Sequence, residues 1–454
     1  MSNEREIEGA PGRVVVVGAG LAAVRTAEEL RRAGFDGELV LVGDETHLPY
    51  DRPPLSKEVL RGDRDDTTLR PREFFDENRI ELRLGTAARS VDTATRTLTL
   101  ADGSELGYDE LVVATGLRPR RIPGLPDLAG VHVLRSLEDS RALRAEIVPG
   151  SRALVVGAGF IGCEVAASLR ARDVDVVLVE PQPTPLASVL GAEVGELVTR
   201  LHRSEGVDVR SGVGLSEIRG DGVASEIHSD GVASEIHSDG VASEIHSDGV
   251  ASEIHSDGVA SEIHSDGVAS EIHSDGRVAS ALLGDGTEVD VDLVILGIGS
   301  VPAVEWLEGS GIELDNGVVC DGVGRTSAPH VWAVGDVASW QLPAGGRRRI
   351  EHWTNAGEQA SVLAKSLVGA EPGAAAQVPY FWSDQYDLKI QGLGAVRGDD
   401  TVHVVRDDGR KFLAYYERDG KLVGVVGAGL AGQVMKTRAK IAAGAPIEEL
   451  LAAV

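Results

Sequence analysis

Residues 14–33 read VVVVGAGLAAVRTAEELRRA and decide the fold. Four consecutive valines predict a buried strand, the glycines predict a tight turn, and apolar residues at helical spacing predict a helix. A second strand is expected at residues 38–45, which read ELVLVGDE. This order of strand, glycine turn, helix and strand predicts a βαβ unit of the dinucleotide-binding kind.

Gly18-x-Gly20-x-x-Ala23 occupies the turn between the first strand and its helix. We expect Gly18 to permit the turn and Gly20 to let a pyrophosphate approach the backbone at the helix N-terminus, where N–H groups favour an anion. Ala23 fits the third position, because that position needs only a small side chain. Asp44 follows the second strand and is placed to accept hydrogen bonds from ribose hydroxyls, with Glu45 as the alternative.

Residues 153–181, ALVVGAGFIGCEVAASLRARDVDVVLVEP, repeat the same order of elements. Gly157-x-Gly159-x-x-Gly162 forms the turn, and Glu180 ends the following strand. A carboxylate there favours NADH, because it binds the ribose 2′-hydroxyl and repels the 2′-phosphate of NADPH. Two such modules predict two dinucleotides, and FAD with NADH is the combination in which hydride passes directly between the cofactors.

The sequence beyond about residue 376 changes to short alternating strands. KFLAYYERDGKLVGVVG, at 411–427, predicts a hairpin that turns at Asp419-Gly420. We therefore predict an α/β protein with two Rossmann-like dinucleotide-binding domains, for FAD and NADH, and a small α+β C-terminal domain. The expected boundaries are 1–145 and 300–375 for the two segments of the FAD-binding domain, 146–299 for the NADH-binding domain and 376–454 for the C-terminal domain.

Residues 221–274 are six identical copies of the nonapeptide DGVASEIHS. Asp-Gly suits a two-residue turn, so a β-meander is possible, although its register would set each Glu opposite another Glu, and like charges directly opposite are unfavourable. An irregular loop is the alternative. The repeat histidines do not predict a metal site, because equivalent positions two strands apart would be separated by about 9–10 Å. The flanking sequences SEIRG and RVASALLGDGTEV predict a hairpin, so the repeat lengthens a turn of the NADH-binding domain.

Charge and composition limit the possible functions. The formal charge of −28 argues against nucleic acid as a partner; the six copies contribute 6 × (−2) = −12 of it, and the rest of the chain carries −28 − (−12) = −16. No apolar run approaches the roughly 20 residues of a membrane helix, and the polar opening predicts a cytoplasmic protein without membrane association. Cys163 and Cys320 are the two cysteines, and their separation excludes a local redox or zinc motif.

Five further stretches, together with the two glycine motifs, show a resemblance to a known family. They are LVGDETHLPYDRPPLSKEVL (41–60), YDELVVATGLRPR (108–120), TSAPHVWAVGDVA (326–338), RIEHWTNAGEQA (349–360) and FWSDQYDLKIQGLG (381–394). In this order they resemble the FAD-dependent ferredoxin reductases of the putidaredoxin reductase and rhodocoxin reductase type, which have the glutathione-reductase-like fold. The resemblance covers nearly the whole chain except the repeat.

The resemblance implies roles for individual residues. The FAD contacts would be Gly18, Gly20, Ala22, Asp44, Lys57, Ala88, Arg135, Asp336 and Trp353. The NADH contacts would be Gly157, Gly159, Ile161, Glu164, Glu180 and Gly299. Lys57 and Glu164 would form the catalytic pair beside the hydride path, since a positive charge there favours the reduced flavin. Thr184 and Ser188 stand where relatives commonly have arginine, which weakens an NADPH interpretation further.

The activity implied by the resemblance is transfer of hydride from NADH to FAD, followed by single-electron transfer to a ferredoxin-type iron–sulfur protein that feeds an oxygenase or cytochrome P450. An NADH oxidase, a quinone-type reductase or an NADH-responsive binding flavoprotein are the alternatives, and both a monomer and a homodimer remain compatible with the sequence. Two basic clusters could attract an acidic ferredoxin. The first is Arg118 with Arg120 and Arg121, and the second is residues 347–349.

Overall fold

The computed structural model describes residues 11–221, 276–342, 345–372 and 378–452, together with 224–225, 236–238, 241–243, 253–256 and 259–262. The fold is mixed α/β, and the chain divides into two compact units. Unit 1 contains Met1–Glu58, Asp63–Arg120 and Gly299–Val454, and unit 2 contains Val59–Gly62 and Arg121–Ile298. Within the described ranges, no helix has the length and apolar character needed to cross a membrane.

A five-stranded parallel sheet forms the centre of unit 1, in the order β24-β7-β1-β2-β3. Its strands are β1 (Arg13–Val17), β2 (Glu38–Gly43), β3 (Ile80–Leu84), β7 (Glu110–Val113) and β24 (Val331–Ala333). Most residues of β1, β2 and β7 are buried, as expected for a parallel sheet that is covered by other elements.

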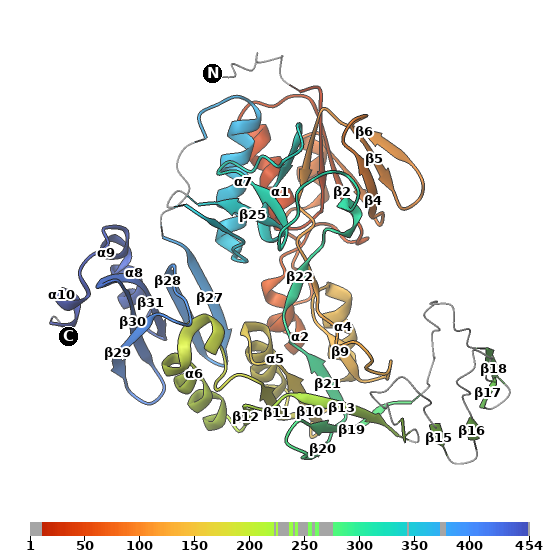
Figure 1. Ribbon diagram of the computed structural model, residues 1–454, viewed down its shortest axis with the longest axis vertical. Helices are drawn as coiled ribbons and strands as arrows, with labels where there is room; N and C mark the ends of the chain where they lie inside the picture. The colour runs from red at the N-terminus through yellow and green to blue at the C-terminus, as the bar shows by residue number, and fades with distance from the viewer. Residues whose placement is uncertain are drawn as a thin grey trace. The chain divides into compact units, whose positions relative to one another are not determined.

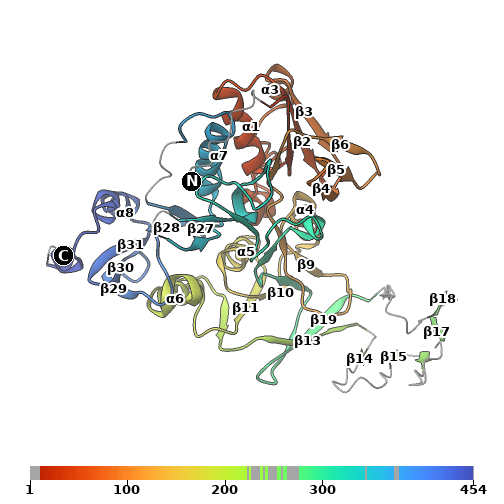
Figure 2. The ribbon, with the colours of Figure 1, turned by 45° about the horizontal axis from the view of Figure 1, so that its top comes forward.

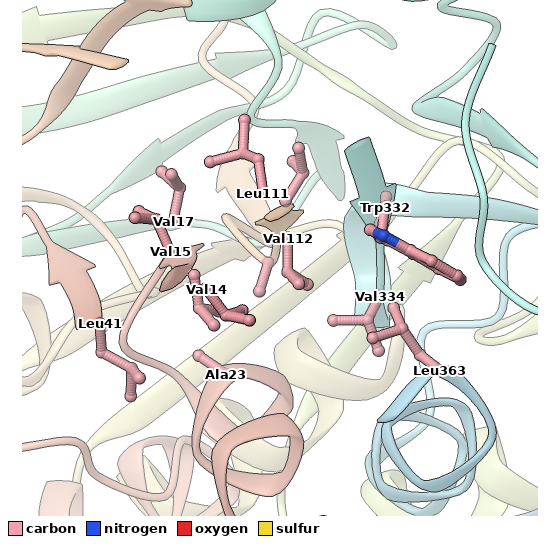
Figure 3. Packing of buried hydrophobic residues seen from close by; sticks show 14 of the residues in the cluster. Val14, Val15, Val17, Ala23, Leu41, Leu111, Val112, Trp332, Val334 and Leu363 are labelled. Atoms are coloured by element: carbon pink, nitrogen blue, oxygen red, sulfur yellow. The ribbon is translucent and has the colours of Figure 1, made fainter. Parts of the chain in front are cut away.

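Helices α1 (Leu21–Arg32) and α7 (Trp353–Leu367) pack side by side, although more than 300 residues separate them in the sequence (Figures 1 and 2). Ala23 of α1 and Leu363 of α7 are fully buried against the sheet, among Val14, Val112 and Val334 (Figure 3). This packing joins the end of the first glycine turn to a helix that comes late in the chain.

Smaller elements complete this part of unit 1. They are η1 (Pro53–Ser56), α3 (Arg72–Glu77), the sheet β4 (Ala88–Asp92), β5 (Thr97–Leu100) and β6 (Glu105–Gly107), the pair β8 (Leu117–Pro119) and β22 (Ser300–Pro302), η2 (Glu305–Leu307), η3 (Gly335–Val337), and the sheet β23 (Val318–Cys320), β25 (Ala338–Gln341) and β26 (Arg347–Arg348). Helix α2 (Glu58–Arg61) lies where the chain passes between the units.

The C-terminal residues of unit 1 form an antiparallel sheet in the order β27-β28-β31-β30-β29. Its elements are β27 (Tyr380–Gln385), β28 (Leu388–Gly394), β29 (Thr401–Asp407), β30 (Phe412–Arg418), β31 (Lys421–Ala428), α8 (Ala431–Lys436), α9 (Arg438–Ala442) and α10 (Ile447–Leu451). Arg418 pairs with Lys421, and the two residues between them, Asp419 and Gly420, have φ values of 52° and 72°. The hairpin turn predicted from Asp-Gly is therefore confirmed.

Unit 2 is built on a second parallel sheet, in the order β12-β11-β10-β21-β9. Its elements are β9 (Val131–Val133), α4 (Leu137–Glu146), β10 (Arg152–Val156), α5 (Phe160–Arg170), β11 (Asp175–Glu180), α6 (Ala187–Ser204), β12 (Asp208–Ser211), β21 (Leu293–Leu296), and the antiparallel β13 (Leu215–Gly220), β19 (Val278–Leu283) and β20 (Glu288–Asp290). Residues 121–145, which the sequence analysis grouped with the first FAD-binding segment, belong to unit 2, because β9 pairs with β21.

Parts of the nonapeptide repeat form antiparallel strands. They are β14 (Ala224–Ser225), β15 (Ile236–Ser238), β16 (Val241–Ser243), β17 (Glu253–Ser256) and β18 (Val259–Glu262). Ser238 pairs with Val241, Ser256 pairs with Val259, and Glu253 pairs with Glu262. This is the register that the meander interpretation requires, so hairpins are confirmed for these strands. The other repeat residues, and the histidine side chains that the metal interpretation concerns, lie outside the described residues.

Deleting residues 221–274 is expected to leave FAD content, NADH preference and turnover nearly unchanged. β13 and β19 pair with each other directly, and the carbonyl of Gly276 accepts a hydrogen bond from Ala129 N–H, so neither contact depends on the repeat. A longer surface loop adds only roughly 0.6 kcal/mol of closure entropy per doubling. Flavin absorbance and NADH kinetics of the deletion variant test this; normal FAD content with loss of reduction by NADH would contradict it.

Candidate functional site

The carboxyl edge of the unit 1 sheet gathers residues from distant parts of the sequence. Gly18 follows β1, Asp44 follows β2, Ala114 follows β7, and Asp336 comes shortly after β24. The strands are parallel, so their carboxyl ends meet at one edge, which is where open α/β sheets bind ligands. The sequence motifs therefore converge on one location.

Gly18 makes the first turn in a conformation that excludes other residues. Its φ is +118°, and a Cβ atom there would lie 2.2 Å from the carbonyl oxygen of Ala114. Its N–H donates to the carbonyl of Val42 at 2.7 Å, which joins the turn to β2. Gly20, at the N-terminus of α1, has no atom within 4 Å of its Cβ position, so its backbone is open to a ligand.

Gln359 is a residue of this edge that the sequence analysis did not identify. It is 5% exposed, and its Oε1 accepts a hydrogen bond of 2.8 Å from the N–H of Gly335. Gly335 has φ +77°, and its Cβ position lies 2.7 Å from the Cβ of Ala22. These two contacts fix the backbone that carries Asp336. The sequence held one signal of this role, because Gln359 is a polar residue at an otherwise apolar position of its helix.

Trp353, the first residue of α7, donates its indole N–H to Asp51 at 2.8 Å. Burial raises the pKa of Asp51, and the hydrogen bond from Trp353 opposes that rise. Lys57 follows η1 and is 4% exposed. The neighbouring His352 has a fully covered Nδ1, and burial together with the Arg348 guanidinium lowers its pKa to about 4, so its ring is neutral at pH 7.

Unit 2 repeats the glycine device at the carboxyl edge of its own sheet. Gly157 has φ +94°, and a Cβ there would lie 2.5 Å from the carbonyl oxygen of Gly297. A Cβ on Gly162 would lie 1.9 Å from the carbonyl oxygen of Gly157, so α5 packs too closely against the turn for any residue but glycine. Gly159 has no atom within 4 Å of its Cβ position. The open glycine again stands at a helix N-terminus.

Both carboxylate oxygens of Glu180 accept backbone hydrogen bonds, one of them from the glycine turn. Oε2 accepts the N–H of Ala158 at 2.7 Å, and Oε1 accepts the N–H of Gln182 at 2.9 Å. Glu180 thus fixes the turn from the end of β11, and its remaining lone pairs are available to a ribose.

The other predicted residues are distributed between the two units. Ala88, which begins β4, and Gly299, which has φ +91°, belong to unit 1. Arg135 belongs to unit 2, where it precedes α4 and donates its backbone N–H to Asp139. Ile161 and Glu164 lie on α5; Ile161 is 45% exposed and Glu164 is 4% exposed.

The two cysteines are buried and unreactive, and some arginines of the predicted basic clusters have partners within the protein. Both cysteines are buried, and burial raises the pKa of Cys163 far above its ordinary value and that of Cys320 to about 12, so both thiols stay protonated. Arg118 pairs with Glu305 at 3.2 Å. Arg349 donates to the carbonyls of Asp336 and Asn316, so it supports the backbone instead of extending the surface cluster.

The residues at these two edges fit dinucleotides. Each edge offers an open glycine at the N-terminus of a helix longer than ten residues, where backbone N–H groups attract a pyrophosphate. Each also has an acidic residue at the end of the adjacent strand, Asp44 or Glu180, for ribose hydroxyls. The donors and acceptors of both edges therefore suit dinucleotides such as FAD and NADH.

Comparison with known proteins agrees with this chemistry. The family described as pyridine nucleotide-disulphide oxidoreductase matches residues 12–245 and 240–360, and the one described as reductase C-terminal matches 380–453. The chain is 34% identical to the ferredoxin–NAD(P)(+) reductase fdr of a Sphingomonas species, over 90% of this chain and 88% of that protein, and 34% identical to rhodocoxin reductase of Rhodococcus erythropolis, over 87% and 80%. Its structure is similar to that of the covalent putidaredoxin reductase–putidaredoxin complex, with TM-score 0.81, 30% identity and coverage of 98% and 96%.

Proposed function

Since this chain belongs to the pyridine nucleotide-disulphide oxidoreductase family and its relatives are ferredoxin–NAD reductases, we propose a role for each part of it. The protein is an FAD-dependent oxidoreductase that passes electrons from NADH to a ferredoxin. FAD, when bound, would supply a hydride acceptor for NADH and a donor of single electrons, chemistry that needs no protein thiol. The observation that carries the assignment is the pair of sheet edges with the same glycine turn.

Unit 1 is assigned to FAD. Backbone N–H groups near Gly20 bind the pyrophosphate, Asp44 accepts from the ribose, and Asp336 accepts from the ribityl hydroxyls. Ala22, Ala88 and Trp353 line the cofactor. Arg135, which belongs to unit 2, contributes a positive charge. Gln359 supports the arrangement because it fixes the backbone beside Asp336.

Unit 2 is assigned to NADH, so two Rossmann-like domains serve two cofactors. Gly159 leaves room for the pyrophosphate, Glu180 binds the ribose, and Ile161 offers an exposed apolar surface. Gly299 lies where the chain returns to unit 1. Lys57 and Glu164 are assigned to hydride transfer, because both are charged residues held almost fully out of water.

Three arginines form the surface that we assign to the ferredoxin. Partial burial lowers the pKa of Arg348, and the positive charges of Arg397 and Arg418 lower it further. Asp400 balances part of this charge through Arg418, at 2.6 Å. In a chain of charge −28 this is a local positive potential, which attracts an acidic partner by electrostatic steering.

Reoxidation of the reduced enzyme in a stopped-flow instrument tests the proposed function. We expect the rate to saturate with ferredoxin concentration, to fall with ionic strength, and to stay slow with oxygen or quinone. Saturation with oxygen or quinone but not with ferredoxin would replace the assignment with an oxidase or quinone reductase.

Replacing Glu180 with alanine is expected to lower kcat/KM for NADH at least tenfold and to narrow the preference for NADH over NADPH. The carboxylate holds Ala158 and Gln182 and excludes the 2′-phosphate, so one change removes both effects. Steady-state kinetics with both coenzymes measure this. Gln at position 180 is the control, because it keeps an acceptor and removes the charge; an unchanged coenzyme ratio in both variants would contradict the assignment.

A further inference from the structure

Trp353 lies at a junction of three elements of unit 1. It begins α7, and its ring is 5.7 Å from the guanidinium carbon of Arg25 on α1. The ring of Trp382, on β27, is 6.1 Å away at an angle of 68°, and Trp382 stacks on Tyr380 at 5.9 Å. A rotation of the Trp353 indole would therefore disturb both helices and the C-terminal sheet.

Asp51 is the hydrogen-bond acceptor that sets this indole. Trp353 Nε1 donates to Asp51 Oδ1 at 2.8 Å, across 302 residues of sequence. The backbone N–H of Asp51 donates to the carbonyl of Thr67 at 2.8 Å, and Tyr50 pairs with Thr68, so the carboxylate is carried by a fixed segment. An indole has one donor, so without this acceptor the ring is oriented only by its packing and by the Arg25 guanidinium.

Among the described residues, the charged groups that act on the ionisation of Asp51 are positive. Besides Trp353, the groups that act on its ionisation are Arg64, Lys57 and Arg25, each of which favours the carboxylate, while burial opposes it more strongly and raises its pKa. Arg25 is also paired with a carboxylate of its own helix, Glu28, at 2.7 Å. Asp51 therefore contacts Trp353 and acts electrostatically on Lys57, two residues that are assigned to the flavin.

We propose that Asp51 is a positioning residue of the flavin site, which holds the Trp353 indole through a hydrogen bond and balances the charge of Lys57. The proposal rests on the proposed function, because that function assigns both residues to FAD. Two separable effects follow. The hydrogen bond affects FAD affinity through the indole, and the negative charge affects the midpoint potential, since a nearby anion disfavours the reduced, anionic flavin.

Three variants separate these effects. Asp51→Leu removes the acceptor and the charge, and is expected to weaken FAD binding to the apoprotein roughly tenfold, as for loss of a hydrogen bond to a charged group. Asp51→Asn keeps an acceptor, so FAD affinity should stay within about threefold, while the midpoint potential becomes more positive. Asp51→Glu keeps the charge and should leave the potential near that of the unchanged protein.

The indole N–H resonance of Trp353 in ¹⁵N-labelled protein gives a readout independent of activity. It is assigned with Trp353→Phe, and should shift as pH falls and Asp51 is protonated, but not titrate in Asp51→Asn. Trp332 is the matched control, because its indole donates to Glu110 at 2.6 Å, so Glu110→Gln should move the Trp332 resonance and leave FAD affinity unchanged.

Two results would overturn the proposal. In the first, the Trp353 resonance is the same in Asp51→Leu as in the unchanged protein. In the second, the resonance moves while FAD affinity and midpoint potential stay constant in all three variants, which would make the contact purely structural. Failure of the proposed function is distinct from both, because the unchanged protein itself would then bind no FAD.

Discussion

Gly18→Ala yields a protein that retains less than about a tenth of the normal FAD after purification. The new Cβ would lie 2.2 Å from the backbone oxygen of Ala114, and the φ of +118° adds strain on the order of 1–3 kcal/mol for any L-residue. The end of β7 cannot yield, because Ala114 N–H donates to the carbonyl of Val17 at 2.7 Å within the parallel sheet. The turn must therefore open, and the N-terminus of α1 moves with it.

Gly20→Ala is the matched control for this prediction. Its Cβ would meet no protein atom within 4 Å, so the apoprotein should fold normally, and any loss of FAD must come from the ligand side of the turn. Bound FAD is measured by absorbance after release, and folding by circular dichroism and thermal unfolding. Normal FAD content in Gly18→Ala would mean that the turn is not the pyrophosphate site.

Lys57→Met slows reduction by NADH about 100-fold, the usual effect of removing one electrostatic stabiliser from a reaction site. Lys57 is 4% exposed, so its charge acts in a low-dielectric environment where it is not screened by solvent. Methionine keeps most of the length and packing. Removal of the cation also takes away one of the groups that lower the pKa of Asp51, so we expect that carboxyl to become harder to ionise.

Single-turnover reduction by NADH and the flavin midpoint potential measure this effect, and the potential should fall. Lys57→Arg is the control, since it keeps the charge. A double-mutant cycle with Glu164→Gln tests whether the two residues act as one unit, in which case the effects are not additive. A normal rate in Lys57→Met with a normal potential would remove Lys57 from the catalytic residues.

The parts of the fold and site that sequence predicted are those determined by local rules. The turns at Gly18 and Gly157 follow from a strand, a small-residue turn and a helix that are contiguous in the chain, and the Asp419-Gly420 hairpin follows from two residues alone. Acidic residues at strand ends, such as Glu180, could be located from the same pattern.

Other features depend on contacts between distant residues and could not be predicted. β9 joins unit 2 because it pairs with β21, about 160 residues later, and nothing in VHV itself indicates that partner. Gln359 and Asp51 are important because of the atoms they meet, Gly335 N–H and the Trp353 indole, and both contacts arise only after α7 packs on α1. The hydrogen bond from Ala158 N–H to Glu180 likewise needs the folded turn.

The hairpin that flanks the nonapeptide repeat has a genetic consequence. Each copy is encoded by a whole number of codons, so the gain or loss of complete copies keeps the reading frame. Gly220, which ends β13, and Val278, which begins β19, pair with each other across the repeat. We therefore expect that a gain or loss of copies leaves the reductase folded, and that an affinity tag or a reporter can be inserted at this position.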